Sequence, residues 1–185
     1  MILRNRITLS FCLLTALALP VGVYASTPEE DVQTLIQQLP ALKPITYQAS
    51  DEKYHIVVFI ENQCGYCADV LKNIKKYTDA VLTMSFLTAA PKSIRDSVIE
   101  DMSRVWCAPD PARSLQNTMK VFLPDNDSTP KCVHLIEQQS ALSDRLGIQA
   151  TPVMVVLKAP PTVFLGNAKP ENILRMQLGS GVKQQ

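Results

Sequence analysis

The feature that most constrains the fold is a pair of cysteines, Cys64 and Cys67, that lies between a predicted strand and a predicted helix. The nearly continuous apolar run at 55–60 is typical of a strand buried on both faces. After a polar turn, apolar residues recur at helical spacing from 64 to 80, which predicts a helix that begins at the first cysteine. A strand followed by a Cys-x-x-Cys helix is the arrangement of a redox-active cysteine pair.

The rest of the chain supplies three more strands and four more helices. Strands are predicted at 82–87, 153–157 and 162–165, and helices at 93–106, 112–122, 133–146 and 170–178. The order of these elements is that of an α/β thioredoxin fold with an inserted helical subdomain. We therefore predict a thioredoxin-like catalytic domain at 54–182 with a helical insert at about 91–147.

Residues 26–53 predict a short N-terminal helix and a linker. Ser26 or Thr27 suits the position of the helix cap, and a short strand is predicted at 45–47. One face of the helix is apolar, at Val32, Leu35, Ile36 and Leu39. This face either docks on the domain or forms a dimer contact, and we favour docking because such a stripe is ordinary for a helix packed on its own core.

Residues 1–25 have the pattern of an export signal. Arg4 and Arg6 precede an apolar run at 7–19, and the small residue Ala25 suits a cleavage site. The run has about 13 residues, fewer than the roughly 20 of a spanning helix, so cleavage after about Ala25 is favoured over retention as an anchor. The predicted location of the mature protein is the periplasm.

Composition agrees with one folded domain, because 46% of the residues are hydrophobic. The net charge of +1 gives no reason to expect a nucleic-acid partner. Of the five cysteines, four lie outside the predicted signal: Cys64, Cys67, Cys107 and Cys132. An even number in an oxidising compartment indicates two disulfides, but three pairings are possible and the sequence alone does not choose among them.

Cys64 is the predicted nucleophile. Only a thiolate attacks a disulfide, and a cysteine in the first helical turn has its pKa lowered by the helix dipole and the unpaired backbone N–H groups. Cys67, one turn later, is the predicted resolving thiol. Gly65 keeps the turn open, and we place both Gly65 and Tyr66 at the substrate-binding surface.

The cysteine pair has two other possible uses. A zinc site would need Cys107 and Cys132 as further ligands, but these lack the second close pair of a zinc ribbon or finger. A purely structural disulfide between Cys64 and Cys67 would close only a very short loop and would stabilise the fold little. We therefore favour the redox pair, and we predict no metal and no cofactor.

Thr151 and Pro152 strengthen the prediction of a redox site. Pro152 directly precedes a predicted central strand, which is unusual for packing alone. In a thioredoxin fold this proline is cis and faces the redox pair, which leaves the backbone of Thr151 free to pair with an extended substrate. We predict both residues as substrate-binding; the alternative is an ordinary trans proline at a strand start.

The motifs resemble those of the periplasmic DsbC and DsbG thiol:disulfide interchange family. The likeness covers about two-thirds of the chain, roughly 53–178, and is carried by Cys64-Gly65-Tyr66-Cys67, Val105-Trp106-Cys107-Ala108, Cys132, and Leu146-Gly147 leading into Thr151-Pro152. It implies that Cys107 and Cys132 form a structural disulfide; the alternative is two free buried thiols. It also implies clients that are cysteine-containing exported proteins and a membrane electron donor of the DsbD type.

The chain departs from this family at its front. The family carries a separate dimerisation domain, whereas only 28 residues, 26 to 53, stand between the predicted cleavage site and the catalytic part. Such a short segment does not form an independent domain with its own core. The sequence therefore does not predict whether the protein is a monomer or a dimer.

Two features bear on the redox direction. Thioredoxins bury a carboxylate at the position of Val58, where it moves the proton of the second cysteine, so that base is missing here. Glu61, Lys72, Lys75 and Lys76 are nearby alternatives, and for each we favour the interpretation as a solvated charge. Tyr66 occupies the place where strong oxidases of the DsbA type have histidine, so we expect a weaker oxidant. The leading hypothesis is a reductase or isomerase of disulfides; the alternatives are a DsbA-like oxidase and a low-turnover folding partner dedicated to a secretion or conjugation assembly.

Overall fold

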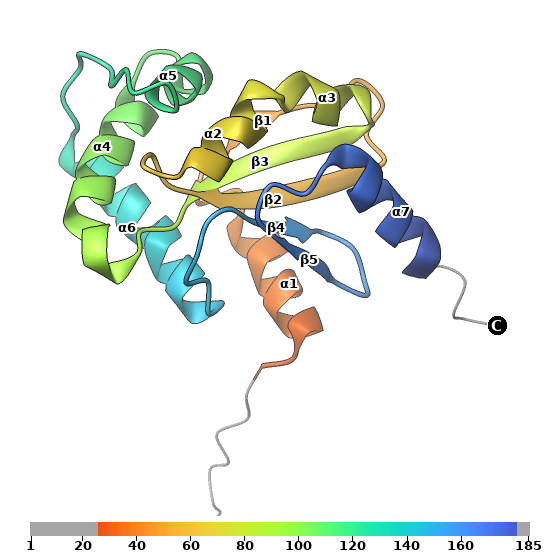
Figure 1. Ribbon diagram of the computed structural model, residues 1–185. Coiled ribbons are helices and arrows are strands. Elements are labelled where there is room, and N and C mark those ends of the chain that lie inside the picture. The colour runs from red at the N-terminus through yellow and green to blue at the C-terminus, as the bar shows by residue number, and fades with distance from the viewer. Residues whose placement is uncertain (1–25, 181–185) are drawn as a thin grey trace, which may run out of the picture.

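The computed structural model describes residues 26–180, and the predicted export signal lies outside the described residues. The described chain forms one five-stranded sheet with helices on both faces (Figure 1). The strands are β1 (Ile45–Tyr47), β2 (Tyr54–Ile60), β3 (Leu82–Thr88), β4 (Val153–Val156) and β5 (Thr162–Leu165). The helices are α1 (Pro28–Gln38), α2 (Gly65–Lys72), α3 (Ile74–Asp79), the short 3-10 helix η1 (Lys92–Ile94), α4 (Arg95–Cys107), α5 (Pro111–Thr118), α6 (Pro130–Arg145) and α7 (Pro170–Ser180).

The strand order is β1-β3-β2-β4-β5, and the central strand β2 runs parallel to β3 and antiparallel to β4. The side chains of β2 alternate between two hydrophobic clusters: Ile56, Val58 and Ile60 lie in one, Val57 and Phe59 in the other. All five are fully buried. The expectation of a strand buried on both faces is thereby confirmed, and so is the α/β thioredoxin fold.

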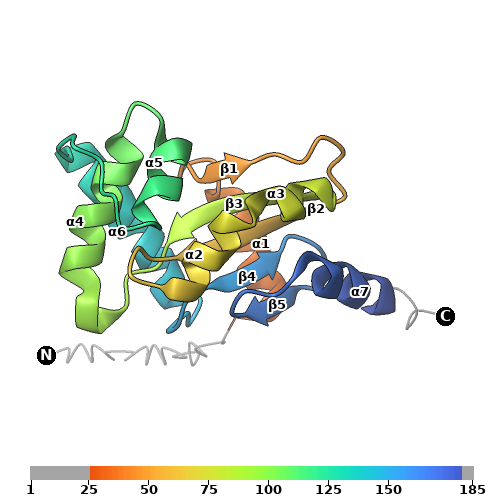
Figure 2. The same cartoon turned by 45° about the horizontal axis from the view of Figure 1, so that its top comes forward.

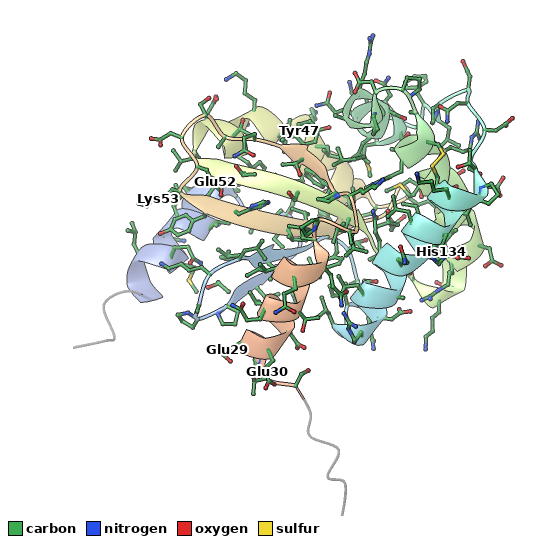
Figure 3. The ribbon with its side chains drawn as sticks, turned by 180° about the vertical axis from the view of Figure 1, so that it is seen from behind. Glu29, Glu30, Tyr47, Glu52, Lys53 and His134 are labelled. Atoms are coloured by element: carbon green, nitrogen blue, oxygen red, sulfur yellow. A yellow bond between two sulfur atoms is a disulfide. The ribbon has the colours of Figure 1, made fainter. Side chains whose placement is uncertain are left out.

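Helix α1 packs on the sheet face that carries Val57 and Phe59. Its side chains Val32, Leu35 and Leu39 belong to the same cluster as that face, whereas Ile36 is 38% exposed. Seen from behind, Glu29 and Glu30 lie at the outer end of the helix (Figure 3). Strand β1 pairs antiparallel with β3. The segment that we separated from the domain at residue 54 therefore packs on the same sheet.

A capping box explains why α1 begins where it does. The Thr27 hydroxyl accepts a hydrogen bond from the Glu30 N–H at 3.2 Å, and the Glu30 carboxylate accepts one from the Thr27 N–H at 2.7 Å. Two backbone donors that the helix leaves unpaired are thus satisfied. Three acidic residues in the first turn also stabilise the helix, because their negative charges interact with the positive end of its dipole.

Helices α4, α5 and α6 form the predicted insert between β3 and β4. They gather at one end of the sheet, and α7 lies at the other (Figure 2). Arg95 at the start of α4 pairs with Asp144 near the end of α6, with 2.8 Å between Nη1 and Oδ2. Among residues 26–180, no helix has both the length and the apolar character needed to cross a membrane.

Three predicted helix boundaries are wrong. The helix expected from 133 begins at Pro130, directly after its cap residue Thr129. The helix expected over 64–80 divides at Asn73, whose backbone leaves the helical region (φ −103°, ψ 14°) and whose side-chain amide donates to the Asp69 carbonyl. The helix expected to reach 122 ends at Thr118. There the N–H groups of Val121 and Phe122 close onto the carbonyls of Thr118 and Asn117, with Val121 at a left-handed φ of 64°.

The docking of α1 makes a prediction about stability. Replacing the fully buried Leu35 with alanine removes its contacts with the sheet and leaves a cavity, so we expect a loss of about 2–5 kcal/mol in the free energy of unfolding. The matched control Ile36→Ala lies on the exposed side of the same helix and is expected to cost less than about 1 kcal/mol. Urea unfolding of the two variants measures the difference, and equal losses would contradict the docking.

Candidate active site

Cys64 and Cys67 form a disulfide at the N-terminus of α2, with their Cα atoms 5.2 Å apart. Cys64 is the cap residue, and its Sγ accepts a hydrogen bond from the Cys67 N–H at 3.1 Å. Cys67 is fully buried, whereas Cys64 is half-buried. The sulfur that solvent and a substrate reach more easily is therefore the one that faces the positive end of the helix.

The Thr151–Pro152 peptide bond is cis and lies beside the disulfide. The Sγ of Cys64 is 3.4 Å from the carbonyl oxygen of Thr151. The carbonyl of Pro152, by contrast, accepts a hydrogen bond from the N–H of Gly166 at 2.8 Å. The Pro152 carbonyl is therefore paired within the domain, whereas the Thr151 carbonyl faces the Sγ of Cys64.

A second cis peptide bond, Ala159–Pro160, lies in the loop between β4 and β5. The sequence does not predict it. No pattern in the sequence distinguishes it from the neighbouring trans prolines.

The two residues between the cysteines lie at the surface. Tyr66 is 63% exposed, and a side chain added at Gly65 would meet nothing within 4 Å. Nothing in the fold itself therefore requires glycine at position 65. The structure brings together the six residues expected at the redox site: Cys64, Gly65, Tyr66, Cys67, Thr151 and Pro152. Their roles stay predictions.

The polar turn between β2 and α2 is held by two hydrogen bonds to α4. Asn62 donates a hydrogen bond from its side chain to the carboxylate of Asp101 at 2.7 Å, and Gln63 donates one to the hydroxyl of Ser97 at 3.0 Å. Both partners lie on α4, so the helical insert fixes the turn that leads into Cys64.

Glu61 was interpreted as a solvated charge, and that interpretation is wrong. Only 5% of its surface is exposed. Its carboxylate accepts a hydrogen bond from the Gln63 N–H at 2.5 Å and another from the Thr151 side chain. Burial raises the pKa of Glu61, and the two hydrogen bonds oppose that rise. Glu61 directly continues the run 56–60, which is buried on both faces of the sheet.

The other charged candidates behave as expected. Lys72, Lys75 and Lys76 are exposed on α2 and α3, and Lys75 pairs with Asp79 at 2.6 Å. Val58 is fully buried among apolar side chains. Glu61 is therefore a buried carboxylate that contacts Gln63, the residue before Cys64.

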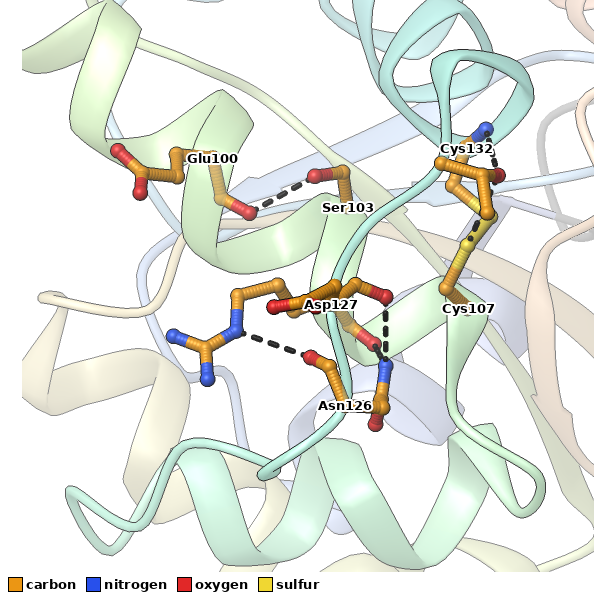
Figure 4. Close-up of a disulfide and its surroundings, with 8 residues drawn as sticks. Glu100, Ser103, Cys107, Asn126, Asp127 and Cys132 are labelled. Atoms are coloured by element: carbon orange, nitrogen blue, oxygen red, sulfur yellow. Dashed lines mark hydrogen bonds between the residues drawn. A yellow bond between two sulfur atoms is a disulfide. The ribbon is translucent and has the colours of Figure 1, made fainter.

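Cys107 and Cys132 form the second disulfide, which joins the last residue of α4 to the first turn of α6 (Figure 4). The loop that it closes is also fixed by Arg104, which donates to the carbonyls of Asn126 and Pro124 at 3.1 and 2.6 Å. The four cysteines of residues 26–180 thus form two separate pairs. In this described part no group of three or more His, Cys, Asp or Glu residues is arranged to hold a metal ion.

Comparison with known proteins places this site in a family. The thioredoxin-like domain family matches residues 42–177. The chain belongs to this family. Solved structures at low identity share its fold: a disulfide interchange protein from Neisseria gonorrhoeae (TM-score 0.58, 18% identity, 74% of this chain and 94% of that one) and the catalytic domain of Proteus mirabilis ScsC (TM-score 0.52, 22% identity, 80% and 98%).

Within this thioredoxin-like family, the chain is similar to proteins named thiol:disulfide interchange protein DsbC. It is 32% identical to the Salmonella typhimurium protein over 126 residues, which are 66% of this chain and 51% of the relative. It is 27% identical to the Haemophilus influenzae protein over 143 residues, which are 76% and 60%. The resemblance to DsbC is thereby confirmed, although the chain spans only 51–60% of the length of these two relatives.

The disulfide between Cys107 and Cys132 is expected to stabilise the fold independently of the disulfide between Cys64 and Cys67. It links residues 25 apart, so the loop-entropy relation credits it with about 3 kcal/mol of stability. We expect Cys107→Ser/Cys132→Ser to lose roughly that much in urea unfolding while Cys64 still forms its disulfide with Cys67. Mass spectrometry of non-reduced digests checks both pairs, and a native link between Cys64 and Cys107 would contradict the assignment.

Proposed function

We propose that this protein is a thiol:disulfide oxidoreductase that reduces or isomerises disulfides in exported proteins. The observation that carries the proposal is the position of Cys64, which caps α2 and lies 3.4 Å from the backbone carbonyl of Thr151. A nucleophilic sulfur and a backbone that pairs with an extended chain thus stand side by side.

In the reduced protein, the helix N-terminus lowers the pKa of Cys64 and favours its thiolate. The Cys64 thiolate attacks one sulfur of a substrate disulfide, the substrate S–S bond breaks, and the other substrate sulfur leaves as a thiolate. The product is a mixed disulfide between Cys64 and the substrate.

The mixed disulfide has two outcomes. For reduction, the Cys67 thiolate attacks Cys64, the second substrate thiol leaves, and the pair returns to the disulfide form; a dithiol donor, which we propose to be of the DsbD type, then supplies two electrons. For isomerisation, a substrate thiolate attacks the mixed disulfide and expels Cys64, so no net electrons are transferred. The burial of Cys67 supports its role as the second thiol, because only an internal sulfur reaches it readily.

The redox direction follows from what surrounds Cys64. Tyr66 is 63% exposed and carries no cation that would stabilise the thiolate, and Glu61 adds a buried carboxylate nearby. A less stabilised reduced form makes a weaker oxidant. Reduction or isomerisation therefore fits this site better than oxidation of the DsbA type.

The clients follow from the same proposal. The names of the DsbC relatives describe thiol:disulfide interchange. We propose cysteine-containing proteins of the periplasm as substrates, reached through the export signal predicted at 1–25.

Serine variants test the two roles. Cys64→Ser is expected to abolish the reduction of insulin and the refolding of scrambled ribonuclease, since no accessible nucleophile is left. Cys67→Ser is expected to accumulate mixed disulfides with substrate, since the escape thiol is missing. Non-reducing electrophoresis measures the trapped species, with Cys107→Ser/Cys132→Ser as the control that traps none. Trapping by Cys64→Ser alone would show that the two roles are reversed.

A further inference from the structure

A buried carboxylate connects the two halves of the candidate site. Glu61 follows the last residue of β2, and Thr151 precedes the cis proline before β4. The antiparallel register pairs Phe59 with Val153, so the chain leaving β2 and the chain entering β4 meet at one end of the sheet. Glu61 lies at that meeting point.

Each half of the site gives Glu61 one hydrogen bond. The Gln63 N–H, next to Cys64 in the chain, donates to Oε2 at 2.5 Å. The Thr151 side chain, on the same residue whose carbonyl faces Sγ, donates the other. Hydrogen bonds to a buried ionised group are among the stronger ones in a protein, because no water replaces them when they break.

The rest of the network does not replace this connection. Asn62 and Gln63 bond to Asp101 and Ser97 on α4, which fixes the turn to the insert but leaves the Thr151 loop untouched. Asp101 is the other carboxylate in this network, and its partner is Asn62. Apart from the contact between the Cys64 Sγ and the Thr151 carbonyl, the bond between Glu61 and Thr151 is the contact described here that joins the two loops through a side chain.

We propose that Glu61 is a positioning residue, which clamps the turn before Cys64 to Thr151 and so sets the nucleophilic sulfur against the backbone that pairs with a peptide substrate. The proposal rests on the proposed function and extends it to a residue outside the Cys-x-x-Cys motif. Because the clamp acts on the peptide-pairing backbone, it matters for extended peptides and not for small disulfides, which need the sulfur alone.

The test compares two substrates on the reduced protein. One is a short extended peptide whose central cysteine carries a mixed disulfide, and the other is cystamine, which has no peptide backbone. The measured quantity is the ratio of the two second-order rate constants, obtained by acid quench and mass spectrometry. The ratio cancels any change in the reactivity of the Cys64 thiolate itself.

Glu61→Ala is expected to lower this ratio about tenfold, the order of effect of one strong hydrogen bond. Thr151→Val, which removes the same hydrogen bond from the other side, is expected to lower it to a similar extent. The double variant is expected to be no worse than Glu61→Ala, because the bond that Thr151→Val removes is already broken in Glu61→Ala. Glu61→Gln keeps one acceptor oxygen and replaces the other with an NH2 donor, so it is expected to give a ratio between those of wild type and Glu61→Ala. The exposed Glu100→Gln on α4 is the matched control and leaves the ratio unchanged.

An unchanged ratio in Glu61→Ala, or losses that add in the double variant, overturns the clamp. If Glu61→Ala does not fold, Thr151→Val decides alone, since an unchanged ratio there has the same consequence. A wild-type protein that reacts with neither substrate overturns the proposed function and the clamp together. A wild-type protein that reacts with both, with Glu61→Ala and Thr151→Val giving the same ratio as wild type, overturns the clamp only.

Discussion

The candidate site depends on the antiparallel pairing of β2 with β4. In that register the chain that leaves β2 runs beside the chain that enters β4, so the turn before Cys64 and the loop at Thr151 converge at one end of the sheet. The register is strongly determined because β2 is buried on both faces: a shift by one residue would exchange the side chains that face the two hydrophobic clusters. Packing of the sheet thus places the sulfur and the peptide-pairing backbone together.

Around this centre, the rest of the chain stabilises the turn and covers the sheet. Helix α1 buries Leu35 on one face, and α2 buries Cys67 and Val70 on the other. The insert reaches the site from the side, through hydrogen bonds from α4 to the turn. The disulfide between Cys107 and Cys132 joins the two longest helices of the insert and so restrains the element that holds the turn. The second disulfide therefore lies in the element that holds the turn before Cys64.

Much of this arrangement could be predicted because it depends on local patterns. The apolar run of β2, the Cys-x-x-Cys pair and the proline before β4 each have a signal within a few residues. The errors arise where tertiary contacts decide. A residue with left-handed backbone follows the end of α5. Such a residue is usually glycine, but here it is Val121, so no residue type in the sequence indicates where this helix ends. Glu61 is polar and follows a strand, which predicts exposure; only the partner loop at Thr151 shows why its burial is tolerated.

The claim that Cys64 and Cys67 are a redox pair, not a structural link, is tested most directly by their equilibrium with glutathione. A helix N-terminus without a neighbouring cation stabilises the reduced form only moderately, so the account predicts a reduction potential of about −130 to −200 mV. The pair should then titrate while Cys107–Cys132 stays oxidised, as quantified by alkylation and mass spectrometry of each cysteine. A potential below about −300 mV, the range of structural disulfides, would contradict the account.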